Sequence, residues 1–172
     1  MREHDWSDVG LDVTVPWQCG NTTVTCLDAV DALLVSGDMT RFAEHQGQIR
    51  SVGLGQAAPD GPFLLRLARD RALWVEPGNA RPPDGWHDGF AISAAGDAYA
   101  IIQLLGDSAR HLLAQGTSTN LHTPSPSAAL LFAGEPAALC RRGDAWWLWV
   151  TRSHLPYHWQ WLQGADSGDA RT

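Results

Sequence analysis

The chain has 172 residues, of which 44% are hydrophobic and 18% are charged, and this composition predicts a folded globular protein with a core of its own. Its formal net charge of −7 argues against a nucleic-acid partner, because nucleic-acid phosphates are bound by clustered lysine and arginine side chains. All twelve basic residues are arginines, which excludes chemistry that needs a lysine amine, such as Schiff-base catalysis.

The cysteines and the hydrophobic runs indicate a cellular location. Cys19, Cys26 and Cys140 form no CxxC pair, and an odd number of cysteines without a signal-peptide pattern predicts thiols in a reducing cytoplasm. No apolar run approaches the roughly 18 residues that would span a bilayer. We therefore expect a cytoplasmic protein that has no membrane partner.

The first half of the chain predicts one β-α-β-β lobe after an N-terminal arm. Residues 1–22 show no hydrophobic period and are assigned to the arm. The segment TVTCLDAVDALLVSG predicts two short strands, and Asp38 is expected to be the N-cap residue of the helix that follows. FLLRLARDRALWVEP predicts a hairpin around an Arg-Asp turn. This first lobe, with the loop after it, occupies residues 23–89.

The second half predicts a similar unit over residues 90–164. FAISA and YAIIQLL are expected to be strands, and Asp107 or Ser108 is expected to cap a helix that ends near Gly116. SAALLFAG, PAALCRR and AWWLWV predict three further strands, and RSHLPYHWQWLQG predicts a terminal helix. Residues 165–172 are expected to be a disordered tail.

The two halves contain a repeat. LLVSGDMTRFAEHQG at 33–47 aligns with IQLLGDSARHLLAQG at 102–116, and both segments run from a strand through Gly-Asp into a helix. A β-α-β-β unit used twice predicts an α+β fold with two lobes, antiparallel sheets and helices packed on one face. Such a corner can bind an anion at the helix N-terminus. Because it recurs, we favour an architectural role, in which glycine permits positive φ and aspartate caps the helix.

The sequence contains few residues with the spacing of a reactive site. His154 and His158 lie four residues apart on the terminal helix, a spacing compatible with zinc, but no HExxH-type acid lies between them. No GxSxG motif occurs, and the cysteines of apolar strands are expected to pack as small hydrophobic side chains. We therefore assign no catalytic, cofactor-binding or metal-binding residue to this chain.

Nine tryptophans are the most unusual feature of the composition. In AWWLWV, Trp147 and Trp149 alternate with Trp146, so both faces of that strand are predicted to be covered. Trp159 and Trp161 follow on the terminal helix. Two interpretations remain open, burial in the core or an exposed aromatic patch that binds a partner. For the second, the candidate interface residues are Trp147, Trp149, Trp159 and Trp161.

Three segments, RALWVEP, AYAIIQLLGDSARHLLAQGTSTNLH and SAALLFAGEPAALCRRGDAWWLWVTRSHLPYHWQWL, carry a family resemblance. Their pattern of apolar positions and anchors resembles the γ subunit of heterotetrameric sarcosine oxidase, which is similar in turn to the aminomethyltransferase (glycine-cleavage T-protein) fold. The resemblance covers residues 63–163 well and 23–62 loosely. Ala91 is a departure, because related sequences have an acid at that turn.

The resemblance implies a non-catalytic γ-like subunit of a flavin-dependent complex that oxidatively demethylates a methylated amine such as sarcosine. It also implies that the chain braces a larger α-like subunit, while FAD, FMN, NAD and tetrahydrofolate are bound by α- and β-like flavoprotein subunits. Two alternatives are a stand-alone folate-binding, aminomethyltransferase-like one-carbon enzyme and a non-redox assembly module of the same fold. Ala91 weakens the enzyme alternative, since its methyl group cannot ionise.

Overall fold

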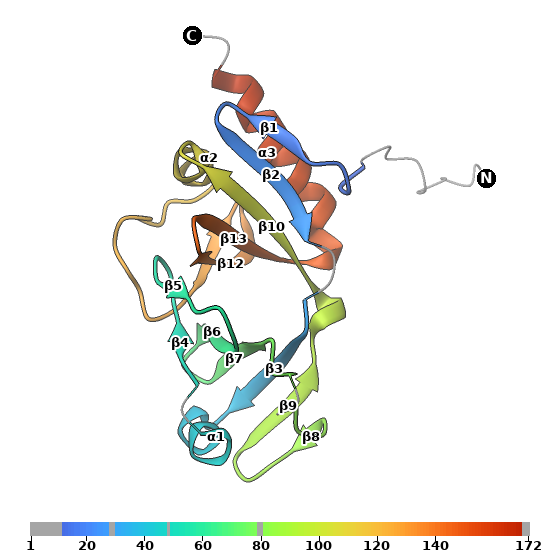
Figure 1. Ribbon diagram of the computed structural model, residues 1–172, viewed down its shortest axis with the longest axis vertical. Helices are drawn as coiled ribbons and strands as arrows, with labels where there is room; N and C mark the ends of the chain where they lie inside the picture. Colours follow the sequence, from blue (N-terminus) through green and yellow to red (C-terminus); the bar gives the residue numbers. More distant parts are fainter. Residues whose placement is uncertain (1–11, 28–29, 48, 79–80, 170–172) are drawn as a thin grey trace, which may run out of the picture.

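The computed structural model describes residues 12–27, 30–47, 49–78 and 81–169 (Figure 1). Its helices are α1 (Met39–Gln46), α2 (Ala109–Gln115) and α3 (Leu155–Asp169). Its strands are β1 (Trp17–Cys19), β2 (Thr22–Leu27), β3 (Ala32–Gly37), β4 (Ser51–Val52), β5 (Ala57–Ala58), β6 (Phe63–Ala68), β7 (Arg71–Val75), β8 (Gly85–Trp86), β9 (Phe90–Ala94), β10 (Tyr99–Gly106), β11 (Ala129–Phe132), β12 (Glu135–Arg142) and β13 (Ala145–Thr151).

The strands form two sheets. Sheet A has the order β1-β2-β10-β13-β12-β11, and β5 also pairs with β12. Sheet B has the order β4-β6-β7-β3-β9-β8. Neighbouring strands are antiparallel except for the short parallel pairs β5–β12 and β4–β6. The predicted α+β class with largely antiparallel sheets is therefore confirmed.

The sheets pack against each other, and helices cover their outer faces. The core between the sheets contains Leu65 and Leu73 of sheet B together with Ile101 and Trp149 of sheet A. On the outer face of sheet B, α1 packs through Phe42. The outer face of sheet A is covered by α2 and α3 (Figure 1). Each sheet therefore has helices on one face only, as the sequence predicts.

One arginine–glutamate pair joins the ends of the two sheets. Arg142 ends β12 and donates two hydrogen bonds to the Glu76 carboxylate, at 2.7 and 2.9 Å, just after β7. These hydrogen bonds hold the pKa of Glu76 below its ordinary value. The same guanidinium lies 4.7 Å from the centre of the Trp147 ring, so it also packs on the core between the sheets.

The sheets do not divide the chain at residue 89 as the sequence suggests. β2 pairs with β10 of the second half, and β9 of the second half pairs with β3. Two strands that are consecutive in the chain thus join different sheets, which hydrophobic periodicity cannot reveal because it predicts strands and not their partners. The arm is also shorter than predicted, since β1 and the start of β2 form one side of sheet A; residues 1–11 lie outside the described residues.

The repeat is present in the backbone. Gly37 and Gly106 end β3 and β10 with φ of +114° and +137°, a region that favours glycine. A Cβ atom at Gly37 would lie 2.6 Å from the Gly89 carbonyl oxygen, and one at Gly106 would overlap the Asn21 carbonyl oxygen. Both glycines are therefore needed for the turn and for the close approach of a second segment.

The helix caps differ between the two copies. Asp38 accepts hydrogen bonds from the backbone N–H groups of Thr40 and Arg41, as predicted for an N-cap residue. Ser108 precedes α2, but its side chain makes no capping hydrogen bond. Since the Asp38 carboxylate accepts hydrogen bonds from the N–H groups of Thr40 and Arg41, it would compete with an anion at that helix end, which supports the architectural role predicted for the corner.

The terminal helix is longer than predicted. α3 begins at Leu155 after a 3₁₀ turn over Arg152–His154 and continues past Gly164 to Asp169. The predicted disordered tail is therefore wrong for residues 165–169, while residues 170–172 lie outside the described residues. A glycine within an exposed helix costs only about 1 kcal/mol relative to alanine, which the preceding packed turns can absorb.

Candidate functional site

The structure places three of the four candidate interface tryptophans inside the chain. Trp149 and Trp159 have no exposed area, and Trp147 is 9% exposed. Trp147 and Trp149 lie in the core between the sheets, whereas Trp159 projects from α3 into the core beneath that helix and meets Trp17 edge-on at 6.3 Å. For these three side chains the burial favours the core interpretation over the interface interpretation.

The fourth tryptophan belongs to a partly exposed aromatic patch. Trp161 lies one turn beyond Tyr157 on α3 and meets Phe132 of β11 edge-on at 5.1 Å. Tyr157 is 47% exposed, and its hydroxyl donates a hydrogen bond of 2.6 Å to the Ala133 carbonyl. We call Tyr157 and Trp161 the α3 aromatic surface. As an interface residue, Trp161 remains a prediction.

His154, in the 3₁₀ turn before α3, and His158, on α3, do not have the geometry of a metal site. His158 is fully buried, and within the described residues neither of its ring nitrogens has a hydrogen-bond partner. Burial, and secondarily the nearby His154, lowers the pKa of His158 to about 4, so the ring is neutral at pH 7. His154 instead faces Glu135, with 3.4 Å between Nδ1 and Oε2. Within the described ranges no three metal-ligating side chains come together.

The cysteine of β12 is also not reactive. Cys140 is buried between the sheets, and this burial raises the pKa of its thiol to about 12. A thiol with that pKa is protonated at neutral pH, and the thiolate is the nucleophilic form. The prediction that this cysteine packs as a small hydrophobic side chain is confirmed.

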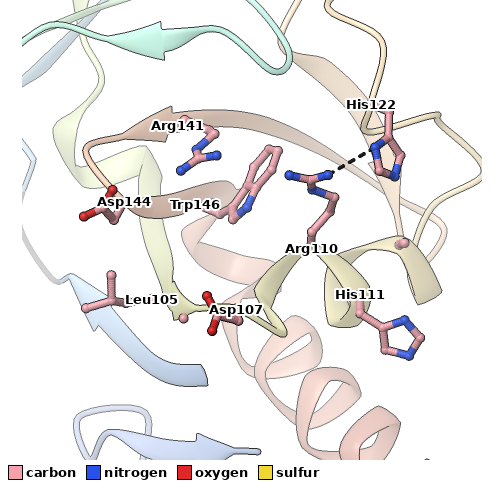
Figure 2. A pocket seen from close by; sticks show the side chains of 10 residues that line it. Leu105, Asp107, Arg110, His111, His122, Arg141, Asp144 and Trp146 are labelled. Carbon is pink, nitrogen blue, oxygen red and sulfur yellow. Dashed lines mark hydrogen bonds between the residues drawn. The ribbon is translucent and has the colours of Figure 1, made fainter. Parts of the chain in front are cut away.

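An open cleft of about 750 Å³ lies beside α2, at the ends of β10 and of the β12–β13 hairpin (Figure 2). Figure 2 shows Arg110 and Arg141 on either side of the Trp146 indole, with His122 beyond Arg110. Arg110 donates a hydrogen bond of 3.1 Å to Nδ1 of His122. The guanidinium carbon of Arg141 lies 5.3 Å from the centre of the Trp146 ring. The residues that line the cleft are Leu105, Gly106, Asp107, Arg110, His111, Ala114, His122, Arg141, Asp144 and Trp146.

A smaller recess of about 170 Å³ shares four residues with this cleft. It is lined by Gly55, Arg110, Leu121, His122, Pro124, Arg141 and Trp146, and we call it the inner recess. Its charged side chains are both arginines, because Asp107 and Asp144 line the outer cleft alone. The inner recess is therefore the cationic part of the site.

Two loops from different halves of the chain line one side of the inner recess, through Gly55 in one and Leu121 and Pro124 in the other. The backbone N–H of Leu54 donates to the Ser127 carbonyl, and the N–H of Ser125 donates to the Leu54 carbonyl, both at 3.1 Å. A Cβ atom at Gly53 would overlap the Ser125 carbonyl oxygen, so the loops can approach this closely only with glycine there. The glycines of SVGLGQ thus have a role that the isolated motif does not reveal.

Sequence reasoning missed the side chains that line the inner recess. Arg110, His122 and Arg141 lie on a helix, a loop and a strand, and no motif relates them. The one available signal was the Gly-Asp corner, since the outer cleft extends over Gly106 and Asp107. α2 itself, with seven residues, is too short to offer an anion site of its own at its N-terminus.

No family model and no curated protein sequence matches the chain. Among solved structures, it is similar to a chain of the heterotetrameric sarcosine oxidase from Corynebacterium sp. U-96, determined in complex with pyrrole 2-carboxylate. The TM-score is 0.65 and the sequence identity is 19%, and the match covers 91% of this chain and 89% of the other. The two chains therefore share their fold over nearly their whole lengths. No helix among the described residues has the length and hydropathy to cross a membrane.

Proposed function

We propose that this chain is a non-catalytic, γ-like subunit of a multi-subunit, flavin-dependent amine oxidase or demethylase of the sarcosine oxidase type. The observation that carries the proposal is the shared fold with a chain of a heterotetrameric sarcosine oxidase over 91% of this chain. The resemblance of three sequence segments to the γ subunit supports it independently of the backbone. In this proposal the chain braces an α-like subunit, and the partner subunits bind FAD, FMN, NAD and tetrahydrofolate.

We assign the contact with the α-like subunit to the α3 aromatic surface. Tyr157 and Trp161 supply aromatic area on a regular helix, and tyrosine and tryptophan are enriched among the residues that dominate binding energy. The Tyr157 hydroxyl is already hydrogen-bonded to Ala133, so its ring is held in place before a partner arrives. His154 and Glu135, both half-exposed, provide a polar rim next to this surface.

Co-expression with the flavoproteins encoded next to its gene tests the proposal. We expect the chain to comigrate with them in size-exclusion chromatography and the complex to contain bound flavin. A chain that elutes alone in the presence of those flavoproteins would contradict the subunit role. It would leave the one-carbon enzyme and the assembly module as the remaining hypotheses, and a titration with tetrahydrofolate would separate these two.

Substitutions on α3 test the assigned surface. Tyr157→Ala removes the exposed ring, and we expect it to weaken the complex at least about tenfold. Gln160→Arg adds a charge to an exposed position of the same helix without removing a core side chain, and it should also weaken the complex. Trp86→Ala is the matched control, because Trp86 is 74% exposed but lies on β8 at the edge of sheet B. Equal loss of binding in the control would place the contact elsewhere.

A further inference from the structure

We propose that the inner recess binds an oxyanion of a small ligand, a carboxylate or a phosphate, through the guanidinium groups of Arg110 and Arg141 that line it. This inference uses only the residues of this chain and does not depend on the proposed subunit role.

The two arginines of the recess have no carboxylate partner among the described residues. Arg110 contacts His122, and Arg141 lies over the Trp146 ring. The position of Arg110 corresponds to Arg41 in the repeat, since 110 − 41 = 69 is the offset that aligns the two halves. Arg41, however, forms ion pairs with Asp88 at 2.6 Å and Asp38 at 3.7 Å. The arginine at this position of the repeat is therefore paired with carboxylates in the first copy. In the second copy it has no carboxylate partner among the described residues.

A cleft of about 610 Å³ also lies at the Gly37–Asp38 corner of the first copy. It is lined by Gly37, Asp38, Met39, Thr40, Ala43, Arg66, Arg69 and Asp70. There Arg66 donates a hydrogen bond of 2.6 Å to the Arg69 carbonyl, and Asp38 accepts from the helix N–H groups. Two arginines and two aspartates line that cleft, as they do the outer cleft of the second copy, whereas the inner recess has two arginines and no carboxylate in its lining.

The shape of the recess favours a small ligand. Its volume of about 170 Å³ is enough for one oxyanion group, and it opens into the larger cleft where the rest of a ligand would lie. Trp146 is buried, and the Arg141 guanidinium lies over its ring at 5.3 Å, within the range of a cation–π contact. The planar guanidinium presents N–H groups in a fork that matches two oxygens of a carboxylate or phosphate.

Calorimetric titration of the full chain in 150 mM sodium chloride tests this inference. The probes are inorganic phosphate and malonate, which present a tetrahedral and a planar oxyanion. At this salt concentration the attraction of an anion to scattered surface charges is largely screened, whereas a recess lined by two guanidiniums retains binding. A parallel readout is the indole N–H resonance of Trp146 in an NMR spectrum, assigned with the Trp146→Phe variant.

Three variants decide the outcome. Arg110→Gln and Arg141→Gln each remove one guanidinium, and we expect either to weaken binding at least about tenfold. Arg41→Gln, the matched control from the first copy, should leave binding unchanged. Circular dichroism should show that all three fold, and Arg110→Lys should restore part of the affinity by restoring the charge.

Each result supports or overturns the inference. Binding of phosphate alone, or of malonate alone, supports it and identifies which oxyanion the recess prefers. If neither probe binds at 20 mM or below, the inference is overturned. It is equally overturned if binding persists in both Arg110→Gln and Arg141→Gln, or if the Trp146 resonance does not move while heat is released, because the anion would then bind elsewhere.

Discussion

The two copies of the strand–glycine–helix corner share a backbone but differ in the chemistry of their surfaces. Gly37 and Gly106 both turn with positive φ and both lie against a neighbouring backbone. The first copy caps its helix with Asp38 and pairs Arg41 with Asp88, whereas the second has an uncapped helix and arginines without carboxylate partners in the described chain. A cleft thus lies at the corner in both copies, and the side chains around it differ in whether they pair with one another.

The two copies also cover their sheets differently. α1 buries one aromatic ring, Phe42, which meets Trp74 and Phe90 edge-on at 5.4 Å. α2 buries aliphatic side chains and shares the outer face of sheet A with α3. The second cover is thus larger, and it includes the buried His158. We therefore predict that low pH and amino-acid substitutions destabilise the helical cover of sheet A and that of sheet B by different amounts.

The corner glycines should show the largest effect. Gly106→Ala places a methyl group onto the Asn21 carbonyl at an unfavourable φ, and we expect it to lower the free energy of unfolding by about 3 kcal/mol or more. Gly37→Ala should cost somewhat less, because its Cβ would stand 2.6 Å from the nearest backbone atom. Urea denaturation measures both values.

Gly164→Ala is the control for these variants. Gly164 lies within α3, and a Cβ atom there meets nothing within 4 Å, so alanine should raise stability by up to about 1 kcal/mol. If Gly106→Ala were as stable as the wild type, the close approach of the backbone at this corner would not require glycine.

Acid should destabilise the cover of sheet A through His158. The ring takes up a proton near pH 6.5 when unfolded but only near about pH 4 when folded, so the unfolded chain binds more protons between these values. Stability from this group is complete above pH 6.5 and falls as the pH is lowered toward 4, by on the order of 3 kcal/mol. Chemical denaturation at a series of pH values measures this loss.

His158→Phe isolates the contribution of this imidazole. The variant fills a similar volume and cannot titrate, so its stability should fall less steeply than that of the wild type between pH 6.5 and 4. Hydrogen exchange should show α3 opening in acid before α1. Parallel pH profiles for the two proteins would mean that the ring is not buried as the structure has it.

The cap difference should give the smallest effect. Asp38→Ala removes the carboxylate that accepts from Thr40 and Arg41, and we expect a loss of about 1 kcal/mol. Ser108→Ala at the other corner should change stability by less than about 0.5 kcal/mol, since that side chain makes no capping bond. Thermal unfolding of the two variants compares them, and equal losses would contradict the assigned asymmetry.

Local features of the fold could be predicted from the sequence, and pairing could not. The helices after Gly37 and Gly106 follow from apolar spacing and capping residues, which act within a few residues. β2 pairs with β10, whereas β3 pairs with β7. This choice of partner is set by tertiary packing and not by the residues within each strand. The apolar pattern of Trp146–Val150 correctly indicated a strand covered on both faces, and burial by the chain itself decided between core and interface.

The residues of the inner recess were harder to predict from the sequence, because they too depend on contacts between distant parts of the chain. Arg110, His122 and Arg141 meet because α2, a loop and β12 converge, and such convergence leaves no spacing in the sequence. Gly53 is an instructive case, since its neighbour in space is Ser125, far away in the chain. A sequence motif reveals residues that local geometry holds together. The residues of the inner recess come from distant parts of the chain, so no motif relates them.

The exchange of β2 and β9 between the sheets also governs how the molecule can move and fold. Opening the two halves about a hinge would tear β2 from the six residue pairs that it forms with β10. Each sheet contains strands from both halves of the chain, so neither sheet can form completely before the second half has been synthesised. Pairing between strands that are distant in the sequence slows folding. A binding partner therefore meets one rigid block, whose shape cannot adjust by bending between its halves.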